Sequence, residues 1–174
     1  MLVNKFNRVL AFIVAACCAK TQSVFGQQNV ATSHKAMVAT VRPEATDAAV
    51  RVLQQGGNAV DAAITAAFTL AVVDGYNSGI GGGCFILIRT PEGKLFAIDG
   101  REAAPRAAKP DMFLQHGKPI PGASEVGPLA SGVPGAVAAY EMAWRAAGRK
   151  PWSELLDEAI SYAADGFTIP EKYA

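Results

Sequence analysis

Residues 84–101, which read CFILIRTPEGKLFAIDGR, limit the fold more than any other stretch of this chain. Two apolar runs, 84–90 and 95–101, flank the turn sequence PEGK at 91–94. Runs of this length and composition predict the two strands of a β-hairpin. Strands that are this apolar require neighbours on both sides, so the hairpin is expected to belong to a larger layered α/β domain.

Helices are predicted on both sides of the hairpin in the sequence. Apolar spacing of the helical type marks residues 44–55, 59–73, 134–148 and 151–166. The segment 59–73 is apolar almost all round, so it is expected to pack on two sides inside the domain. Each of the other helical segments ends in glycine, which enters the left-handed region without strain.

Several local signals refine these boundaries. Asn58 is expected to cap the helix 59–73, with Asp61 as the partner in a capping box. Pro134 is expected at the first position of its helix. The segment 37–41 (MVATV) is a third strand candidate, and a short helix is expected near 110–115 within an otherwise irregular stretch.

The first 26 residues resemble an export signal. Lys5 and Arg8 precede the apolar run 9–18, and small residues before Gln27 offer a cleavage site after Gly26. This run is too short to span a bilayer, which takes about 20 residues. A competing interpretation is a bacterial lipobox at 14–17, which would attach a lipid to Cys17. We therefore expect a periplasmic or secreted protein, or a lipid-anchored one, with a polar leader at 27–36.

Composition excludes some function classes. The chain has 174 residues and a net charge of +1, and removal of the basic signal segment leaves a slight acidic excess. The absence of a basic face or an arginine-rich run argues against nucleic acid as a partner. With Cys17 and Cys18 in the signal segment, Cys84 alone remains, so no internal disulfide is expected. The two histidines are far apart in the sequence, and no metal site or cofactor is predicted.

Four sequence blocks occur in a characteristic order. They read MVAT…A…L…GGNAVDAAITAAFTLAVV (37–73), GIGGGCFILI (79–88), DGREAAP (99–105) and SGVPGAVAAYEMA (131–143). Together they resemble the start of the large subunit of gamma-glutamyltranspeptidases, also called glutathione hydrolases. The resemblance covers roughly residues 36–170, so the segment 37–174 is expected to be the N-terminal part of a truncated large subunit.

The resemblance implies a fold and a mechanism. Family members are N-terminal nucleophile hydrolases with an αββα sandwich, of which this chain would hold an incomplete part. A precursor cleaves itself into two subunits, and the new N-terminal threonine of the small subunit attacks the gamma-glutamyl amide, with its own amino group as base. No catalytic residue is therefore expected within this chain, and the missing small subunit is its expected partner.

Arg101 matches the family's carboxylate-binding arginine. A planar guanidinium holds the free α-carboxylate of a gamma-glutamyl substrate through two parallel hydrogen bonds. Glu102 is a second candidate, which would orient Arg101 or the substrate amine. A salt bridge at the end of the strand is the alternative for both residues.

Cys84, Ser131 and the glycines of 79–83 could have a chemical role, but each is expected to have a structural one. Cys84 replaces a glycine found in many family members and is expected to be a packed core residue rather than a nucleophile. Ser131 has no neighbouring histidine in the sequence and is expected to be a turn or cap residue. The glycines of 79–83 do not match a phosphate-binding pattern, and they are expected to let the backbone pass close to another wall of the site.

The family's nucleophile half has no counterpart in this sequence. The first hypothesis is therefore a fragment of an exported gamma-glutamyl hydrolase or transferase that is inactive by itself. The alternatives are a truncated, non-catalytic product that persists as an interaction protein, and a relative of the cephalosporin acylases, which share much of the pattern. A reading frame that continues past codon 174 to a threonine block would favour the first hypothesis.

Overall fold

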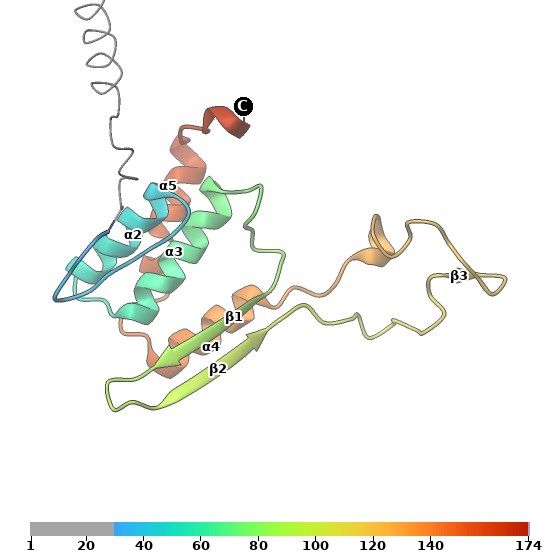
Figure 1. Cartoon of the computed structure of the whole chain (residues 1–174), viewed down its shortest axis with the longest axis horizontal. Helices are drawn as coiled ribbons and strands as arrows, with labels where there is room; N and C mark the ends of the chain where they lie inside the picture. Colours follow the sequence, from blue (N-terminus) through green and yellow to red (C-terminus); the bar gives the residue numbers. More distant parts are fainter. Residues whose placement is uncertain (1–29, 174) are drawn as a thin grey trace, which may run out of the picture. The chain divides into compact units, whose positions relative to one another are not determined.

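The computed structural model describes residues 30–173 (Figure 1). The chain divides into two units, residues 1–34 and 35–174, and the second unit holds all the helices and strands described below. The predicted signal segment 1–26, with its cleavage and lipidation sites, lies outside the described residues.

Two helices open the second unit as predicted. Helix α2 (Pro43–Gln54) starts on a proline whose fixed φ suits the first turn, and it buries its alanine face and Val52. Gly56 follows at φ +86°, which confirms that glycine ends this helix. Helix α3 (Ala59–Val73) packs along α2 and forms much of the interior.

The predicted capping box at the start of α3 is confirmed. The Asn58 side-chain oxygen accepts hydrogen bonds from the backbone N–H groups of Val60 and Asp61, at 2.9 and 3.1 Å. The Asp61 carboxylate in turn accepts from the Asn58 N–H at 2.9 Å. These bonds satisfy N–H groups that a helix start otherwise leaves without partners.

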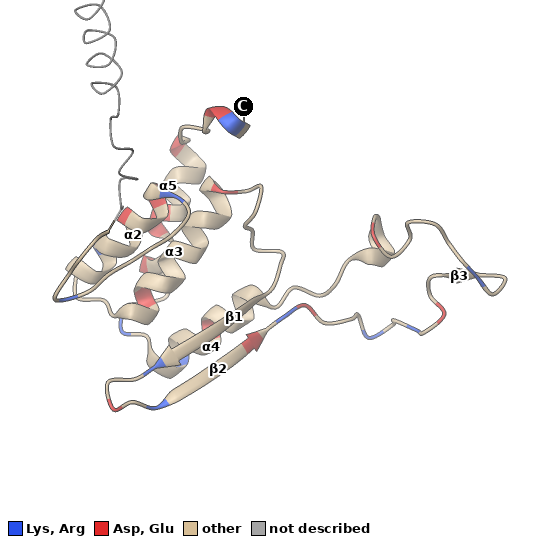
Figure 2. Cartoon of the chain, viewed as in Figure 1, with Lys and Arg blue, Asp and Glu red and all other residues tan. Residues whose placement is uncertain are grey.

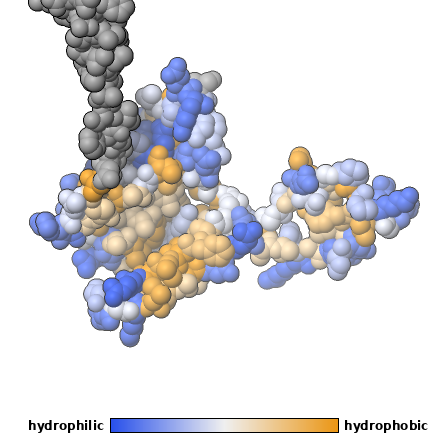
Figure 3. Space-filling view, viewed as in Figure 1, coloured by the Kyte–Doolittle hydropathy of each residue, from blue (hydrophilic) through white to orange (hydrophobic). Residues whose placement is uncertain are grey.

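The predicted hairpin is confirmed as strands β1 (Cys84–Arg89) and β2 (Leu95–Gly100). One face packs on the interior through Ile86, Ile88 and Ile98, whereas Phe85 and Leu87 on the other face are 70% and 69% exposed. Figure 3 shows this apolar surface as an orange area over the hairpin.

Helix α4 (Ala136–Ala147) packs beneath the hairpin and presents Ala139 and Ala143 to it. Phe68 of α3 meets the rings of Tyr140 and Trp152 edge to face, at centroid distances of 5.4 and 5.6 Å. One hydrophobic core thus joins α3, the hairpin, α4 and the start of the following segment.

The expected start of this helix at Pro134 is wrong by two residues. The helix begins at Ala136 with Gly135 as its N-cap, so Pro134 lies before it. The Gly82 carbonyl accepts hydrogen bonds from the N–H groups of Gly135 and Ala136, at 3.2 and 3.1 Å. A tertiary contact with the glycine loop therefore sets where this helix begins.

The predicted helix 151–166 is divided into a 3₁₀ turn, η2 (Ser153–Leu156), and helix α5 (Asp157–Asp165). Leu155 and Ala159 are buried, whereas Ile160 is 59% exposed. A 3₁₀ turn has three residues per turn instead of 3.6, so it changes which side chains share a face. A further 3₁₀ turn, η3 (Glu171–Tyr173), places Tyr173 in a stack with Tyr76.

Two expectations for the irregular parts are wrong. Residues 37–41 form no strand, because the segment finds no strand partner among residues 30–173. Residues 110–113 form turns rather than a helix, followed by the two-residue strands β3 (Leu114–Gln115) and β4 (Lys118–Pro119) and the 3₁₀ turn η1 (Pro128–Ala130). The described residues have a mixed α and β fold, as predicted.

Charges do not define a face of this unit. Figure 2 shows acidic and basic residues dispersed over its helices and loops. Within residues 30–173 no helix is both long and apolar enough to cross a membrane.

Candidate functional site

Segments from three of the four sequence blocks meet at the end of β2. The glycine loop 79–83, the segment 99–105 and the segment 131–135 contact one another around Gly100 and Glu102. Ala103 and Val133 exchange two backbone hydrogen bonds, of 3.1 and 2.8 Å, which join the second and third of these segments. The blocks are far apart in the sequence but form one site in space.

Glycine is required at two of these contacts. A side-chain carbon added to Gly83 would lie 2.7 Å from a Glu102 carboxylate oxygen and 2.8 Å from the Gly100 carbonyl. A side-chain carbon at Gly135 would collide with the same Gly100 carbonyl. The steric interpretation of the glycine loop 79–83 is therefore confirmed at Gly83, and Gly135 has a similar role that the sequence analysis did not predict.

Arg101 follows β2 directly, and its backbone is held in place. Its N–H donates to the Asp99 carboxylate at 2.9 Å, whereas its side chain is exposed. Within residues 30–173 the guanidinium has no hydrogen bond or ion pair. By contrast, Arg51 pairs with Glu158 and Arg145 pairs with Glu141. Arg101 therefore keeps all its side-chain donors available for a ligand.

A hollow of about 580 Å³ lies beside Arg101 and Glu102. Its remaining lining comes from the glycine loop, from the segment after β2 and from the end of η1, namely Gly81, Ala103, Ala104, Pro105, Ala108, Met112, Phe113, Leu129, Ala130, Ser131 and Gly132. No periodic pattern in the sequence marks Met112, Phe113 and Leu129, because the first two lie in turns and Leu129 lies in the short 3₁₀ turn η1. The hollow thus combines the Arg101 guanidinium and the Glu102 carboxylate with apolar side chains such as Met112, Phe113 and Leu129.

Glu102 lies against the glycine loop rather than against Arg101. A side-chain carbon added to Gly82 or Gly83 would lie 3.6 or 2.7 Å from one of its carboxylate oxygens. Among the described residues Glu102 and Arg101 form no ion pair. The Glu102 charge nevertheless affects the neighbouring Cys84 thiol. Burial, with a smaller contribution from Glu102, raises the pKa of the Cys84 thiol.

Neither Cys84 nor Ser131 has the surroundings of a nucleophile. A raised pKa keeps the Cys84 thiol protonated, and its sulfur lies 4.0 Å from the Ala136 carbonyl, where the residue is partly buried against the core. Ser131 is the C-cap of η1, as expected for a turn or cap residue. Among the described residues no group of three His, Cys, Asp or Glu side chains forms a metal site.

A family model described as gamma-glutamyltranspeptidase matches residues 45–174 of this sequence. The chain belongs to the gamma-glutamyltranspeptidase family. This match confirms the resemblance that the four sequence blocks predict.

Two relatives define the extent of the match. Glutathione hydrolase proenzyme 1 of Schizosaccharomyces pombe is 38% identical over 95% of this chain and 26% of its own length. The glutathione hydrolase proenzyme of Pseudomonas aeruginosa is 46% identical over 71% of this chain and 22% of its own length. The chain thus spans about a quarter of the length of these gamma-glutamyltranspeptidase relatives.

Solved structures agree with this assignment. Helicobacter pylori gamma-glutamyltranspeptidase superposes with a TM-score of 0.79 at 40% identity, covering 82% of this chain and 41% of that chain. A cephalosporin acylase from Bacillus halodurans superposes with a TM-score of 0.68 at 30% identity, covering 85% and 28% respectively. The described α and β elements therefore have the arrangement found in the gamma-glutamyltranspeptidase family.

Proposed function

We propose that this chain is the N-terminal part of the large subunit of a gamma-glutamyl hydrolase or transferase, and that Arg101 binds the α-carboxylate of the substrate. The observation that carries the proposal is the unpaired Arg101 guanidinium beside the hollow of about 580 Å³. Two parallel charge-assisted hydrogen bonds would fix both the position and the orientation of an amino-acid carboxylate there. Glu102, on the glycine loop side, would accept a hydrogen bond from the substrate α-amine.

The nucleophile is proposed to lie outside this chain. Cys84 is protonated and packed, and Ser131 caps a turn, so neither supplies the attacking group. An N-terminal threonine of a small subunit would attack the gamma-glutamyl carbonyl and pass the acyl group to water or to an amine. In this scheme the two subunits together complete an αββα sandwich, and the chain alone has no activity.

Export is a further part of the proposal. Residues 1–26 would direct the protein to the periplasm or the medium, with cleavage after Gly26, followed by the leader 27–36. Lipidation at Cys17 is the alternative and would anchor the protein to a membrane. The intact mass of the mature protein and its partition into detergent distinguish these two outcomes.

The substrate site is tested in a hybrid enzyme. Residues 37–174 replace the matching segment of the Pseudomonas aeruginosa glutathione hydrolase proenzyme. Arg101→Lys keeps the charge but loses the two-pronged geometry, so KM for a gamma-glutamyl amide is expected to rise about tenfold or more. Arg106→Lys, at an exposed arginine outside the hollow, is the matched control. An unchanged KM in Arg101→Lys would contradict the proposal that Arg101 binds the substrate carboxylate.

Acyl transfer from a cephalosporin side chain is a second candidate function, favoured by the match to the Bacillus halodurans acylase. If the acylase function holds, the hybrid will cleave the side-chain amide of a cephalosporin faster than a gamma-glutamyl amide. The gamma-glutamyl function predicts the opposite preference.

A further inference from the structure

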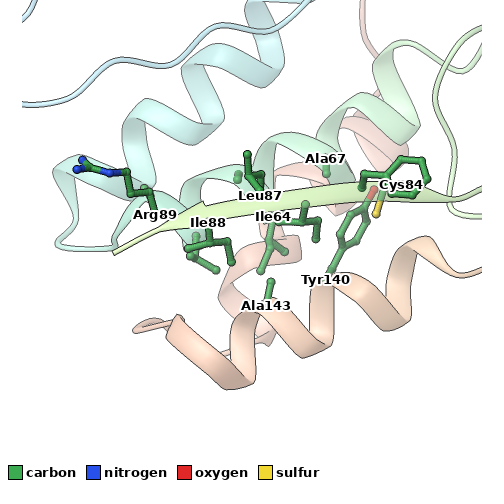
Figure 4. A pocket seen from close by; sticks show the side chains of 13 residues that line it. Ile64, Ala67, Cys84, Leu87, Ile88, Arg89, Tyr140 and Ala143 are labelled. Atoms are coloured by element: carbon green, nitrogen blue, oxygen red, sulfur yellow. The ribbon is translucent and has the colours of Figure 1, made fainter. Parts of the chain in front are cut away.

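The Cys84 end of the hairpin is a packed support for the residues that follow β2. Figure 4 shows Tyr140 of α4 reaching toward Cys84, and the Cys84 sulfur lies 4.0 Å from the Ala136 carbonyl. Gly100 faces Cys84 across the hairpin as the last residue of β2. Arg101 therefore leaves the sheet at a packed end of the strand, which favours a defined position for its backbone.

The hairpin itself offers no partner to the Arg101 N–H. The Thr90 N–H donates to the Lys94 carbonyl at 2.8 Å, and this bonded pair continues the register of β1 with β2. Bonded pairs alternate along an antiparallel ladder, so Cys84 and Gly100 form a bonded pair and the N–H of the next residue points away from β1. The Arg101 N–H therefore needs a partner from outside the β1–β2 ladder.

Asp99 supplies this partner. Its carboxylate lies on the exposed face of β2 and accepts a hydrogen bond from the Arg101 N–H at 2.9 Å. After Arg101, Ala103 and Val133 exchange backbone hydrogen bonds of 3.1 and 2.8 Å. The Arg101 backbone is thus held on one side by the Asp99 side chain and on the other by a tertiary contact.

A second arginine shows a contact that Asp99 does not make. Glu44 lies two positions from Arg42 and accepts two hydrogen bonds from its guanidinium, at 3.1 and 2.7 Å. Asp99 lies at the same spacing from Arg101, but its side chain is one methylene shorter and binds the backbone N–H. Among the described residues Asp99 and Arg101 form no ion pair. The Asp99 bond therefore holds Arg101 while the donors of its guanidinium stay available.

We infer that Asp99 is a positioning residue of the carboxylate site, which holds the Arg101 backbone so that the unpaired guanidinium lies at the hollow of about 580 Å³. The inference rests on the proposed function, in which Arg101 binds the α-carboxylate of the substrate. A guanidinium that is already in position loses less freedom when the substrate binds, so Asp99 raises affinity without touching the substrate. The bond is exposed and contributes little to the stability of the fold, so the two roles are separable.

Three substitutions of Asp99 in the hybrid with the Pseudomonas aeruginosa proenzyme separate the acceptor from the charge. Asp99→Ala removes the acceptor and is expected to raise KM for a gamma-glutamyl amide about fivefold or more, with kcat changed less than about twofold. Asp99→Asn provides an acceptor oxygen without the charge and is expected to recover KM to within about twofold of the parent hybrid. Asp99→Glu keeps the charge, but its longer chain reaches the guanidinium as Glu44 reaches Arg42, so KM is expected to rise about fivefold or more.

Two further measurements separate positioning from a general loss of structure. Asp47→Ala, the same substitution at an exposed position of α2 outside the hollow, is expected to leave KM within about twofold. In the full chain, the Arg101 N–H is expected to exchange at least about threefold faster in Asp99→Ala than in Asp99→Asn, as measured by NMR, with equal urea midpoints. Equal exchange in these two variants would overturn the inference, because the Asp99 bond would then not hold the backbone.

The kinetic outcomes are distinct. A KM for Asp99→Asn as high as that for Asp99→Ala would assign the effect to charge and overturn the inference. In an Arg101→Ala hybrid, Asp99→Ala is expected to change KM by no more than about twofold, and a full-size rise would overturn the inference because Asp99 would act independently of Arg101. An unchanged KM in Asp99→Ala beside a raised KM in Arg101→Ala contradicts only this inference. An unchanged KM in Arg101→Ala contradicts the proposed function as well.

Discussion

At the scale of single residues, the candidate site depends on where a side chain is absent. Gly83 and Gly135 let two backbone segments approach Gly100, which places the unpaired Arg101 at the mouth of a hollow. The sequence predicted a steric role for the glycines of 79–83, including Gly83, but not for Gly135. It did not predict which atoms would collide, because that depends on segments about 50 residues apart in the chain.

Gly83→Ala is expected to destabilise the full chain by about 1–3 kcal/mol, because the new carbon would displace Glu102 and the end of β2. Gly81→Ala is the matched control, since a carbon added there meets nothing within 4 Å. Urea unfolding of the two variants measures the difference. Equal stability would show that the loop can move away from Glu102.

Asp61 has a larger structural role than its place in a capping box suggests. Besides the Asn58 N–H, its buried carboxylate accepts hydrogen bonds from the N–H groups of Arg149 and Lys150, at 2.9 and 3.3 Å. Asn58 donates from its side chain to the Ala147 carbonyl at 2.6 Å. The pair thus joins the start of α3 to the end of α4, which no local sequence signal reveals.

Asp61→Asn is expected to lower the free energy of unfolding by about 2 kcal/mol. The asparagine side chain has one acceptor oxygen, whereas both carboxylate oxygens of Asp61 accept hydrogen bonds from backbone N–H groups. Asp111→Asn, at an exposed turn, is the control. Thermal or urea unfolding provides the measurement. A cost no larger than that of the control would mean that the Asp61 bonds contribute little.

At the scale of elements, the Arg42 side chain joins two segments that are distant in the sequence. Arg42 donates two side-chain hydrogen bonds to Glu44, at 3.1 and 2.7 Å, and one to the Thr168 carbonyl at 3.3 Å. It therefore links the start of α2 to the segment after α5. The hydrogen bonds with Arg42 lower the pKa of Glu44 below its ordinary value.

A lowered native pKa gives this contact a defined pH dependence. Its contribution is fully present above the ordinary Glu pKa of 4.5 and is lost as the pH falls through the lower native value. Glu44→Gln is therefore expected to be less stable than the wild-type chain near neutral pH, with a difference that shrinks in acid. Glu125→Gln, at an exposed site without an ion pair, should show no such trend. A pH-independent difference for Glu44→Gln would contradict the assignment.

The elements also show what the sequence can and cannot predict. Helices α2 and α3 and the hairpin were predicted within one or two residues, because their periodicity, caps and turn residues are local. The strand at 37–41 and the unbroken helix at 151–166 were wrong, because a strand depends on its partners and a 3₁₀ turn depends on packing around Trp152. The lining of the hollow by Met112 and Phe113 could not be predicted, since that segment has no periodicity.

At the scale of the whole molecule, the hairpin presents an apolar face and a free edge while the site has a cation without a partner. These features have one explanation in the proposal, namely that further polypeptide completes the sheet and brings a nucleophile to the hollow beside Arg101. The family assignment and the share of the relatives that the chain spans agree with it.

The most direct test of the central claim is a cycle that combines a protein variant with a substrate variant in the hybrid enzyme. The substrate is a gamma-glutamyl amide with its α-carboxylate either free or converted to a neutral amide, and the measured quantity is kcat/KM. In the hybrid that retains Arg101, neutralising the carboxylate should lower kcat/KM about 100-fold. In the Arg101→Ala hybrid the loss should be much smaller, because that variant has already lost the contact between the guanidinium and the carboxylate. An equal loss in both enzymes would show that Arg101 does not bind the α-carboxylate.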